Sequence, residues 1–150
     1  MRADGRPRLY YVGKERIAAI GLPDKNDHCY VCGRENARGL KVPFGPDGEG
    51  GSRAVYTVQN EHIGWPGLLH GGLAFALMDE ALGWCLYYSG LRGYTARAET
   101  RFRNPAPVGT SLVVTAKLVG RRRRLVDARA ELRAESGGLV AEVEATMYLV

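Results

Sequence analysis

The chain has 150 residues, of which 45% are hydrophobic, and a formal net charge of +5. A chain of this length buries about 70% of its unfolded surface in one core, so we expect a single domain over residues 1–150. No stretch reaches the roughly 20 uncharged apolar residues that cross a bilayer, and residues 1–7 lack the apolar region of a signal peptide. We therefore expect a cytoplasmic protein with no membrane partner. Three cysteines are an odd set and predict no disulfide framework.

Residues 1–28 are expected to form an N-terminal extension of uncertain structure. Within it, residues 9–12 fit a short strand, and residues 16–22 fit either one helical turn or another strand. The pattern becomes clear from residue 40 onward. Residues 40–44 and 52–58 flank a Gly-rich turn, which predicts a β-hairpin, and Pro43 argues for an edge strand.

Residues 72–88 are predicted to form a helix, since this run is too long for a strand and rich in Ala, Leu and Met. Its apolar residues occupy almost every face, which indicates a helix enclosed by other structure. Asp79 and Glu80 are its only charges. A carboxylate in such a setting is costly unless it is paired, hydrogen-bonded or exposed at a site, so at least one of the two requires an explanation.

The rest of the chain alternates between apolar and polar residues with period two, which predicts four antiparallel strands. In the first of them, Ala96, Ala98, Thr100 and Phe102 are expected on the face opposite to Thr95. The fold class is therefore α+β, with about six strands wrapped around one helix. One sheet covers only one side of that helix, so its remaining apolar faces are expected to meet a second copy of the chain. The four strands are expected at 95–103, 112–119, 125–133 and 141–149.

His70, Gly71 and Gly72 stand where a loop becomes this helix. The first N–H groups of a helix have no partner within it, glycine allows close approach, and the helix dipole favours a developing oxyanion. An ordinary glycine-rich helix start would explain the glycines alone, but a carboxylate in the same helix favours a site. Nine residues of helix, about 13 Å, separate His70 from Asp79. One chain therefore cannot bring both to one carbonyl carbon, and two chains with antiparallel helices can.

A family resemblance rests on the run from His70 to Ala81, with Gly64-Trp65-Pro66-Gly67 before it and Thr95 and Arg103-Asn104-Pro105 after it. This pattern resembles the hot-dog-fold acyl-CoA thioesterases of the phenylacetate-pathway (PaaI-like) type, from about Cys29 to the C-terminus. The resemblance implies a hot-dog fold and a homodimer, or a dimer of dimers, with central helices antiparallel across a two-fold axis. It also implies hydrolysis of an acyl-CoA to free acid and CoA, with no cofactor.

The resemblance assigns the catalytic carboxylate to Asp79, nine positions after the motif histidine. Asp79 would act as general base on a water or as a nucleophile that forms a mixed anhydride; the alternative is a structural carboxylate. Glu80, about 100° away around the helix, is the weaker candidate. Thr95 matches a hydroxyl that orients the water, or is simply a β-favouring residue. His70 would position the helix start and contact substrate, or be a satisfied core histidine.

One position departs from the family pattern. Many relatives carry Asn or Gln six residues before the motif histidine to bind the thioester oxygen, and here that position is Gly64. His62 or Asn60, from the same loop, is the expected substitute.

Four consecutive arginines at 121–124 predict a phosphate-bearing partner, because guanidinium groups bind phosphate oxygens as a fork. Charge alone does not separate a nucleic acid from a coenzyme, and a solvated hairpin tip is the plain alternative. The resemblance favours the phosphates of CoA, with Arg121, Arg122 and Arg123 as contacts and Arg103, together with Arg101, as secondary candidates. Phe75, Trp84 and Trp65 would line the acyl chain or belong to the core.

Cys29 and Cys32 form a Cys-x-x-Cys pair, which is half of a structural zinc site. The second cysteine pair is missing, so we expect no metal; His28 with His62 would be the only completion visible in the sequence.

Three other functions were weighed against a thioesterase. A non-catalytic acyl-CoA sensor with a hot-dog fold would lack the carboxylate or carry a DNA-binding segment. Direct nucleic-acid binding would need stacking aromatics near the arginine run. A hot-dog dehydratase would space its histidine and acidic residue differently.

Overall fold

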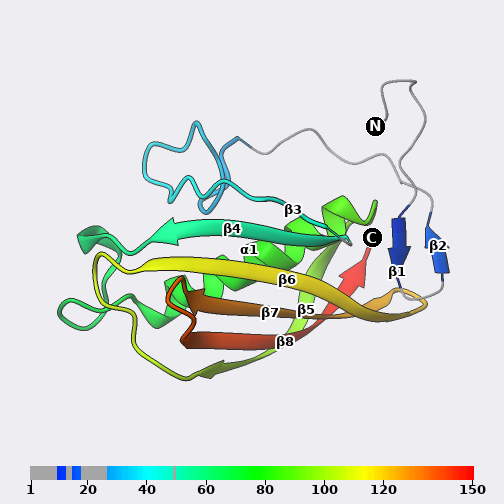
Figure 1. The fold of residues 1–150 in the computed structure, drawn as a ribbon. Coiled ribbons are helices and arrows are strands. Elements are labelled where there is room, and N and C mark those ends of the chain that lie inside the picture. The colour runs from blue at the N-terminus through cyan, green and yellow to red at the C-terminus, as the bar shows by residue number, and fades with distance from the viewer. Residues whose placement is uncertain (1–9, 13–14, 18–26, 49) are drawn as a thin grey trace.

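The computed structural model describes residues 10–12, 15–17, 27–48 and 50–150, and it contains one long helix packed against an antiparallel sheet (Figure 1). The helix, α1, spans Gly71–Tyr88. The six strands lie in the order β3-β4-β6-β7-β8-β5. Their bounds are β3 Gly45–Asp47, β4 Gly51–Thr57, β5 Gly93–Phe102, β6 Ser111–Arg122, β7 Leu125–Ala134 and β8 Leu139–Leu149. This arrangement confirms the predicted α+β hot-dog fold.

Two smaller features complete the described chain. Strands β1 (Tyr10–Val12) and β2 (Glu15–Ile17) pair with each other in a separate two-stranded sheet. Residues 10–12 of the strand predicted at 9–12 are therefore found in a strand. The segment at 16–22, for which a helical turn and a strand were both considered, begins as a strand. Leu9 and residues 18–22 lie outside the described residues. A short 3-10 helix, η1, spans Asn60–His62 in the loop before α1. None of the helices in the described chain has the length and apolar character needed to cross a membrane.

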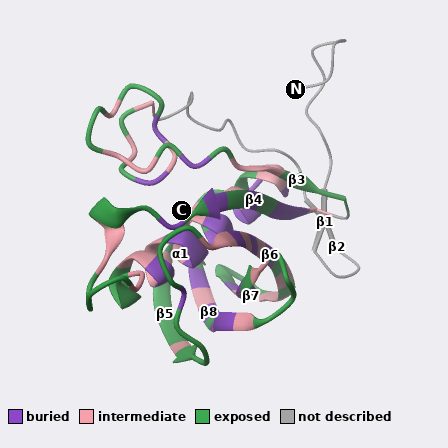
Figure 2. Cartoon of the chain, turned by 60° about the vertical axis from the view of Figure 1, so that its left-hand side comes forward, coloured by how far each residue is buried: buried purple, intermediate pink, exposed green. Residues whose placement is uncertain are grey.

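The core lies between α1 and the sheet face that curves around it (Figure 2). Apolar residues from every turn of the helix meet alternate residues of β4, β6, β7 and β8, as helical and period-two spacing require. Burial of this apolar area is the main contribution that stabilises the fold. The largest fully buried side chains include Leu77, Met78, Leu82, Leu86, Leu112, Val114, Val126, Leu132 and Val143.

The helix ends in a Schellman motif. Gly90 adopts a positive φ of 72°, its N–H donates to the carbonyl of Tyr87, and the N–H of Leu91 donates to the carbonyl of Leu86. The helix is also fixed at its middle. The hydroxyl of Ser52 on β4, which is fully buried, donates a hydrogen bond of 2.6 Å to the carbonyl of Ala81.

Two details differ from the sequence prediction. The first strand of the hairpin lies at Gly45–Asp47, not at residues 40–44. The observed turn is shorter than the predicted one, and its residues Gly48 and Gly50 have positive φ. The strand is nevertheless at the sheet edge, as predicted. In β5, a bulge between Thr95 and Arg97 breaks the alternation. Thr95 therefore pairs with buried Met147 and lies on the helix-facing side, the same side as Ala98, whereas period two placed the two on opposite faces.

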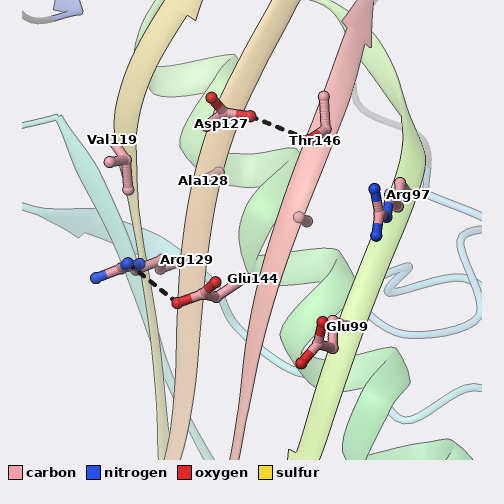
Figure 3. Close-up of a pocket in the computed structure, with 9 residues that line it drawn as sticks. Arg97, Glu99, Val119, Asp127, Ala128, Arg129, Glu144 and Thr146 are labelled. Carbon is pink, nitrogen blue, oxygen red and sulfur yellow. Dashed lines mark hydrogen bonds and ion pairs between the residues drawn. The ribbon is translucent and has the colours of Figure 1, made fainter.

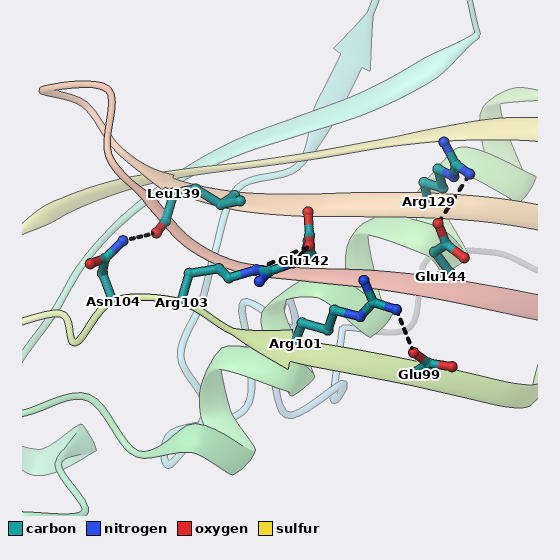
Figure 4. A network of polar contacts seen from close by, with 8 residues as sticks. All are labelled: Glu99, Arg101, Arg103, Asn104, Arg129, Leu139, Glu142 and Glu144. Atoms are coloured by element: carbon teal, nitrogen blue, oxygen red, sulfur yellow. Dashed lines mark hydrogen bonds and ion pairs between the residues drawn. The ribbon is translucent and has the colours of Figure 1, made fainter.

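The outer face of the sheet is charged, with both signs side by side. Figure 3 shows Arg97, Glu99, Asp127 and Arg129 around a shallow hollow of about 350 Å³ on β5, β7 and β8. These charges pair across neighbouring strands, as in Arg129 on β7 with Glu144 on β8 at 3.0 Å, and along one strand, as in Arg101 with Glu99 on β5 at 3.0 Å (Figure 4). Acidic and basic side chains therefore alternate on this part of the sheet, which is not uniformly basic.

Candidate active site

Asp79 lies in the middle of α1 and is held by the strand beside it. The hydroxyl of Thr95 donates a hydrogen bond of 2.5 Å to Asp79 Oδ1. The bulge in β5 makes this contact possible, because it turns Thr95 toward the helix. Both side chains are partly exposed.

Glu80 faces a different set of partners. The indole N–H of Trp84 donates to Glu80 Oε1 at 3.1 Å, and Cys29 Sγ lies 3.5 Å from each carboxylate oxygen. Burial, reinforced by the neighbouring Glu80 carboxylate, raises the pKa of the Cys32 thiol well above its usual range. The two adjacent acidic residues of α1 thus have separate environments, and only Asp79 is oriented by Thr95.

His70 caps the start of α1 with its own side chain. Its Nδ1 accepts a hydrogen bond of 2.9 Å from the Gly72 N–H, which leaves the ring proton on Nε2. The carbonyl of His70 accepts from Leu73 and Ala74, both at 3.0 Å. Gly72 was expected as a free donor, and this is wrong because the histidine ring already occupies its N–H. Among the described residues we find no hydrogen bond to the N–H of Gly71, which lies on the exposed helix start.

The loop before the helix start explains the departure at Gly64. A Cβ at Gly64 would lie 3.1 Å from the His70 ring and 3.3 Å from its Cα, so a longer side chain fits only if His70 moves. His62, the expected substitute, has its Nδ1 hydrogen-bonded to the Tyr56 hydroxyl at 2.6 Å, and burial raises the pKa of that phenol. His62 also supports the loop through its carbonyl, which accepts from the His70 N–H at 3.0 Å.

The arginines predicted to contact the coenzyme divide into two groups. Arg103 is engaged within the chain: its Nη2 and Nε lie 2.6 and 3.2 Å from Glu142 Oε1, and this hydrogen bond lowers the pKa of the Glu142 carboxyl. Arg101 is likewise paired with Glu99. The β6–β7 hairpin carries the others, with Arg123 at its tip in a positive-φ conformation of 55°.

Strand register places Arg121 in line with Thr95. Thr95 pairs with Met147, Met147 with Val126, and Val126 with Arg121. Directly paired residues share a face, so Arg121 lies on the helix-facing side, about 14 Å from Thr95 at 4.8 Å per strand. Its Nε donates to the Arg123 carbonyl at 2.9 Å, which braces the hairpin. Arg122, the next residue, lies on the outer face.

The helix start lies at the other end of the molecule. Strand β6 begins at Ser111, which pairs with Thr57 close to the loop that leads to His70, and it ends at Arg122. Figure 1 shows this loop and the β6–β7 hairpin at opposite ends of the sheet. Within one chain, the His70–Gly71 helix start therefore lies toward one end of the sheet and Arg121 toward the other, with Asp79 and Thr95 between them.

Apolar groups are exposed around the helix start. Trp65 is 81% exposed and Phe102 is 59% exposed, and the ring of Phe102 lies where a Cβ on Gly71 would touch it at 3.6 Å. They border a hollow of about 270 Å³ that Leu68 and Val140 also line. Trp65 is thus not a core residue of the single chain, which was one of the two roles considered for it.

The other two aromatic candidates lie along α1. Phe75 packs partly buried against the core. Trp84 belongs to an aromatic group with Phe44, Tyr87 and Tyr88, with ring centroids 5.1 to 6.4 Å apart. This group borders a second hollow of about 270 Å³ that reaches Cys32.

A family model described as the thioesterase superfamily matches residues 66–141, which include the helix start, Asp79, Thr95 and the arginine hairpin. The chain belongs to the thioesterase superfamily. The superfamily region leaves out Cys29, Cys32 and the loop around them. Comparison with curated proteins gave no significant match.

Solved structures of the thioesterase superfamily share this fold. One crystal structure of a superfamily protein has a TM-score of 0.78 and 30% identity; the match covers 81% of this chain and 60% of that protein. The Escherichia coli PaaI protein of the phenylacetic acid degradation operon has a TM-score of 0.70 and 21% identity over 74% of this chain and 80% of its own. A hypothetical thioesterase of Streptococcus pneumoniae, solved with coenzyme A, has a TM-score of 0.69 and 20% identity; the match covers 73% of this chain and 88% of that protein.

Proposed function

We propose that this protein hydrolyses an acyl-CoA thioester to a free acid and CoA. The hydrogen bond between Thr95 and Asp79 carries the proposal. This hydrogen bond fixes Oδ1 of Asp79, which lies on a largely apolar helix, and leaves Oδ2 to act on a water or on the thioester. A carboxylate that served only to stabilise the helix would be expected to pair with a cation or a backbone N–H.

Two routes are compatible with this carboxylate. As a general base, Asp79 takes a proton from a water whose oxygen attacks the thioester carbon; the C–S bond then breaks, and Asp79 returns that proton to the departing thiolate. As a nucleophile, Asp79 attacks the carbon itself, CoA leaves, and water hydrolyses the mixed anhydride. In either route the carbonyl oxygen becomes negative, and the Gly71 N–H at the positive end of a helix dipole would stabilise it.

The Gly71 that serves a given Asp79 would come from a second copy of the chain. Asp79 and Gly71 of one chain lie about 12 Å apart along the helix axis, too far to act on one carbonyl group. Strand β5 supports such pairing, because it forms a sheet edge and none of its ten residues is buried. Exposed Phe102 and Trp65 lie beside this edge and would be covered by a partner. A cytoplasmic homodimer, or a dimer of dimers, follows as part of the proposal.

Related structures support the choice of residues. The Streptococcus pneumoniae protein has been crystallised with CoA, and also as an Asp→Ala and a Thr→Ala variant. The two substituted positions of that protein are 16 residues apart, the same separation as Asp79 and Thr95. On the substrate side, Arg121 on the helix-facing side of its hairpin is the best-placed contact for the CoA phosphates.

The test is thiol release from short, long and aromatic acyl-CoAs by the wild type and by Asp79→Asn, which keeps the size of the side chain. We expect turnover to fall at least about 100-fold in the variant, in line with the contribution of a general base, with an unchanged melting temperature. Equal rates would refute the assignment of Asp79. Wild-type protein that binds CoA esters and hydrolyses none of them would instead be an acyl-CoA sensor.

A further inference from the structure

Two cysteines and a carboxylate meet beside α1, outside the region matched by the superfamily. One ligand atom each from Cys29, Cys32 and Glu80 can be chosen so that all three lie within 4.8 Å of one another. Cys29 and Cys32 belong to the loop before β3, and Glu80 is 51 residues beyond Cys29 in the chain. All three are partly buried, and Cys32 also lines the hollow beside Trp84.

We propose that Cys29, Cys32 and Glu80 bind one zinc ion, with a water in the fourth position. Zinc takes four ligands in a tetrahedron and favours thiolate sulfur together with nitrogen or carboxylate oxygen. With Zn–S of about 2.3 Å and Zn–O of about 2.0 Å, a tetrahedral S···O edge is about 3.5 Å. Cys29 Sγ lies 3.5 Å from each oxygen of Glu80. Cys29 and Glu80 are therefore already spaced for a shared ion, and the Cys32 thiol lies within 4.8 Å of their ligand atoms.

The backbone around the cysteines holds them in this position. The Gly33 N–H donates to the Cys29 carbonyl at 2.9 Å, which closes a tight turn over residues 29–33. A Cβ at Gly33 would lie 2.5 Å from three backbone atoms, the Asp27 oxygen and the Cys29 nitrogen and oxygen, so only glycine fits. The Leu40 N–H donates to the Tyr30 carbonyl at 2.8 Å and ties the turn to the following segment. Two thiols that project from one braced turn lose little freedom on binding an ion.

Glu80 is oriented as a metal-binding carboxylate commonly is. The Trp84 indole N–H donates to its Oε1 at 3.1 Å, which fixes the rotamer and leaves Oε2 for the ion. We expected no metal because the sequence offers no second cysteine pair. His62 is hydrogen-bonded to Tyr56, and His28 Nε2 lies 3.6 Å from Glu35, so the structure supplies the third ligand from the helix instead.

Such an ion would join the N-terminal loop to α1 one residue from Asp79. Its role would be to hold the loop against the helix, since the three ligands come from two segments that are far apart in the sequence. The site does not depend on hydrolysis, so its test is independent of the proposed thioesterase activity.

The test uses the full-length chain, reduced and handled without oxygen. Zinc per chain is measured by elemental analysis, and the apo-protein is titrated with Co²⁺, whose thiolate charge-transfer absorption reports sulfur ligation. We expect about one zinc per chain, an intense Co²⁺–thiolate band and a higher melting temperature with metal. Cys29→Ser and Cys32→Ser should each weaken the band and the affinity. Glu80→Gln, which keeps an acceptor for Trp84, should weaken affinity at least about 100-fold.

Cys85→Ala is the matched control, because Cys85 is buried elsewhere, with its thiol 3.4 Å from the Gly50 carbonyl. It should bind metal as the wild type does. Reduced wild-type protein that contains no zinc and gives no thiolate band with Co²⁺ would overturn the proposal. Metal binding that survives all three ligand substitutions would overturn it equally, as would a Cys29–Cys32 disulfide that persists under reducing conditions.

Discussion

The hydroxyl of Thr95 lies 2.5 Å from Asp79 Oδ1, across the boundary between strand β5 and helix α1. Replacing Thr95 with Val keeps the shape of the side chain and removes only the donor. A hydrogen bond to a charged group contributes about 1.5–3 kcal/mol, so we expect kcat to fall roughly 10- to 100-fold with KM little changed. Thr95→Ser should stay within a few-fold of wild type. Steady-state kinetics on the best acyl-CoA measures both, and a Val variant as active as the Ser variant would remove Thr95 from the site.

Gly71 allows its N–H to be deleted without breaking the helix. Proline is favoured at the first helical position, and His70, with φ −61° and ψ 130°, has the conformation that precedes proline well. Gly71→Pro should therefore lower kcat about 100- to 1,000-fold, as expected for one oxyanion donor, whereas Gly71→Ala, whose Cβ meets Phe102 at an ordinary 3.6 Å, should not.

Mixing two inactive variants tests whether each site uses two chains. If Asp79 comes from one chain and Gly71 from the other, a heterodimer of Asp79→Asn with Gly71→Pro contains one intact site and one doubly damaged site. Equal amounts, unfolded and refolded together, should then recover about a quarter of wild-type activity. If both residues of a site belonged to one chain, the mixture would stay inactive.

Arg121 and Arg122 carry the same charge on opposite faces of one hairpin. Removing a partly exposed charged contact costs about 1 kcal/mol, so Arg121→Ala should raise KM for acyl-CoA roughly 5-fold. Arg122→Ala should have a smaller effect. A short acyl thioester of N-acetylcysteamine, which lacks the nucleotide, should be hydrolysed equally by both variants. An unchanged KM for acyl-CoA in Arg121→Ala would exclude this contact.

The buried thiol of Cys85 is expected to make the folded protein less stable at alkaline pH. Burial raises the pKa of its thiol from 9.0 to about 12. The pKa of this thiol is higher in the folded protein than in the unfolded chain. The neutral thiol therefore stabilises the folded state fully below about pH 9, and this stabilisation is lost as the pH rises toward 12. Between pH 9 and 10.5 the free energy of unfolding should fall by roughly 2 kcal/mol more in the wild type than in Cys85→Ala. Urea unfolding at both pH values gives this difference, and parallel losses in the two proteins would contradict it.

Much of the fold is predictable because its signals are local. Helical composition at residues 72–88 and period-two alternation after residue 93 gave one helix and four strands close to their observed bounds. The bulge at Thr95 was missed because its cause is not local. It becomes evident only when β5 is set against β8, where Thr95 and Arg97 pair with the consecutive residues Met147 and Thr146.

Side-chain partners were predicted less well than backbone elements. The sequence predicted that the helix begins after His70, but not that the His70 ring occupies the Gly72 N–H. A capping histidine directly before two glycines is a local pattern that could have suggested it. The meeting of Glu80 with Cys29 joins residues 51 positions apart and has no sequence signal beyond an unexplained carboxylate.

Ser52 extends the functional region into a strand that carries no reacting group. Its hydroxyl sets where the carbonyl of Ala81, and with it the neighbouring turn of α1, lies relative to β4. A shift of about 1 Å in a reacting group can cost 100-fold in rate, so Ser52→Ala is expected to appear as slow turnover in a folded protein. Variants of this kind would be mistaken for losses of chemistry, although what they change is the alignment of the whole helix.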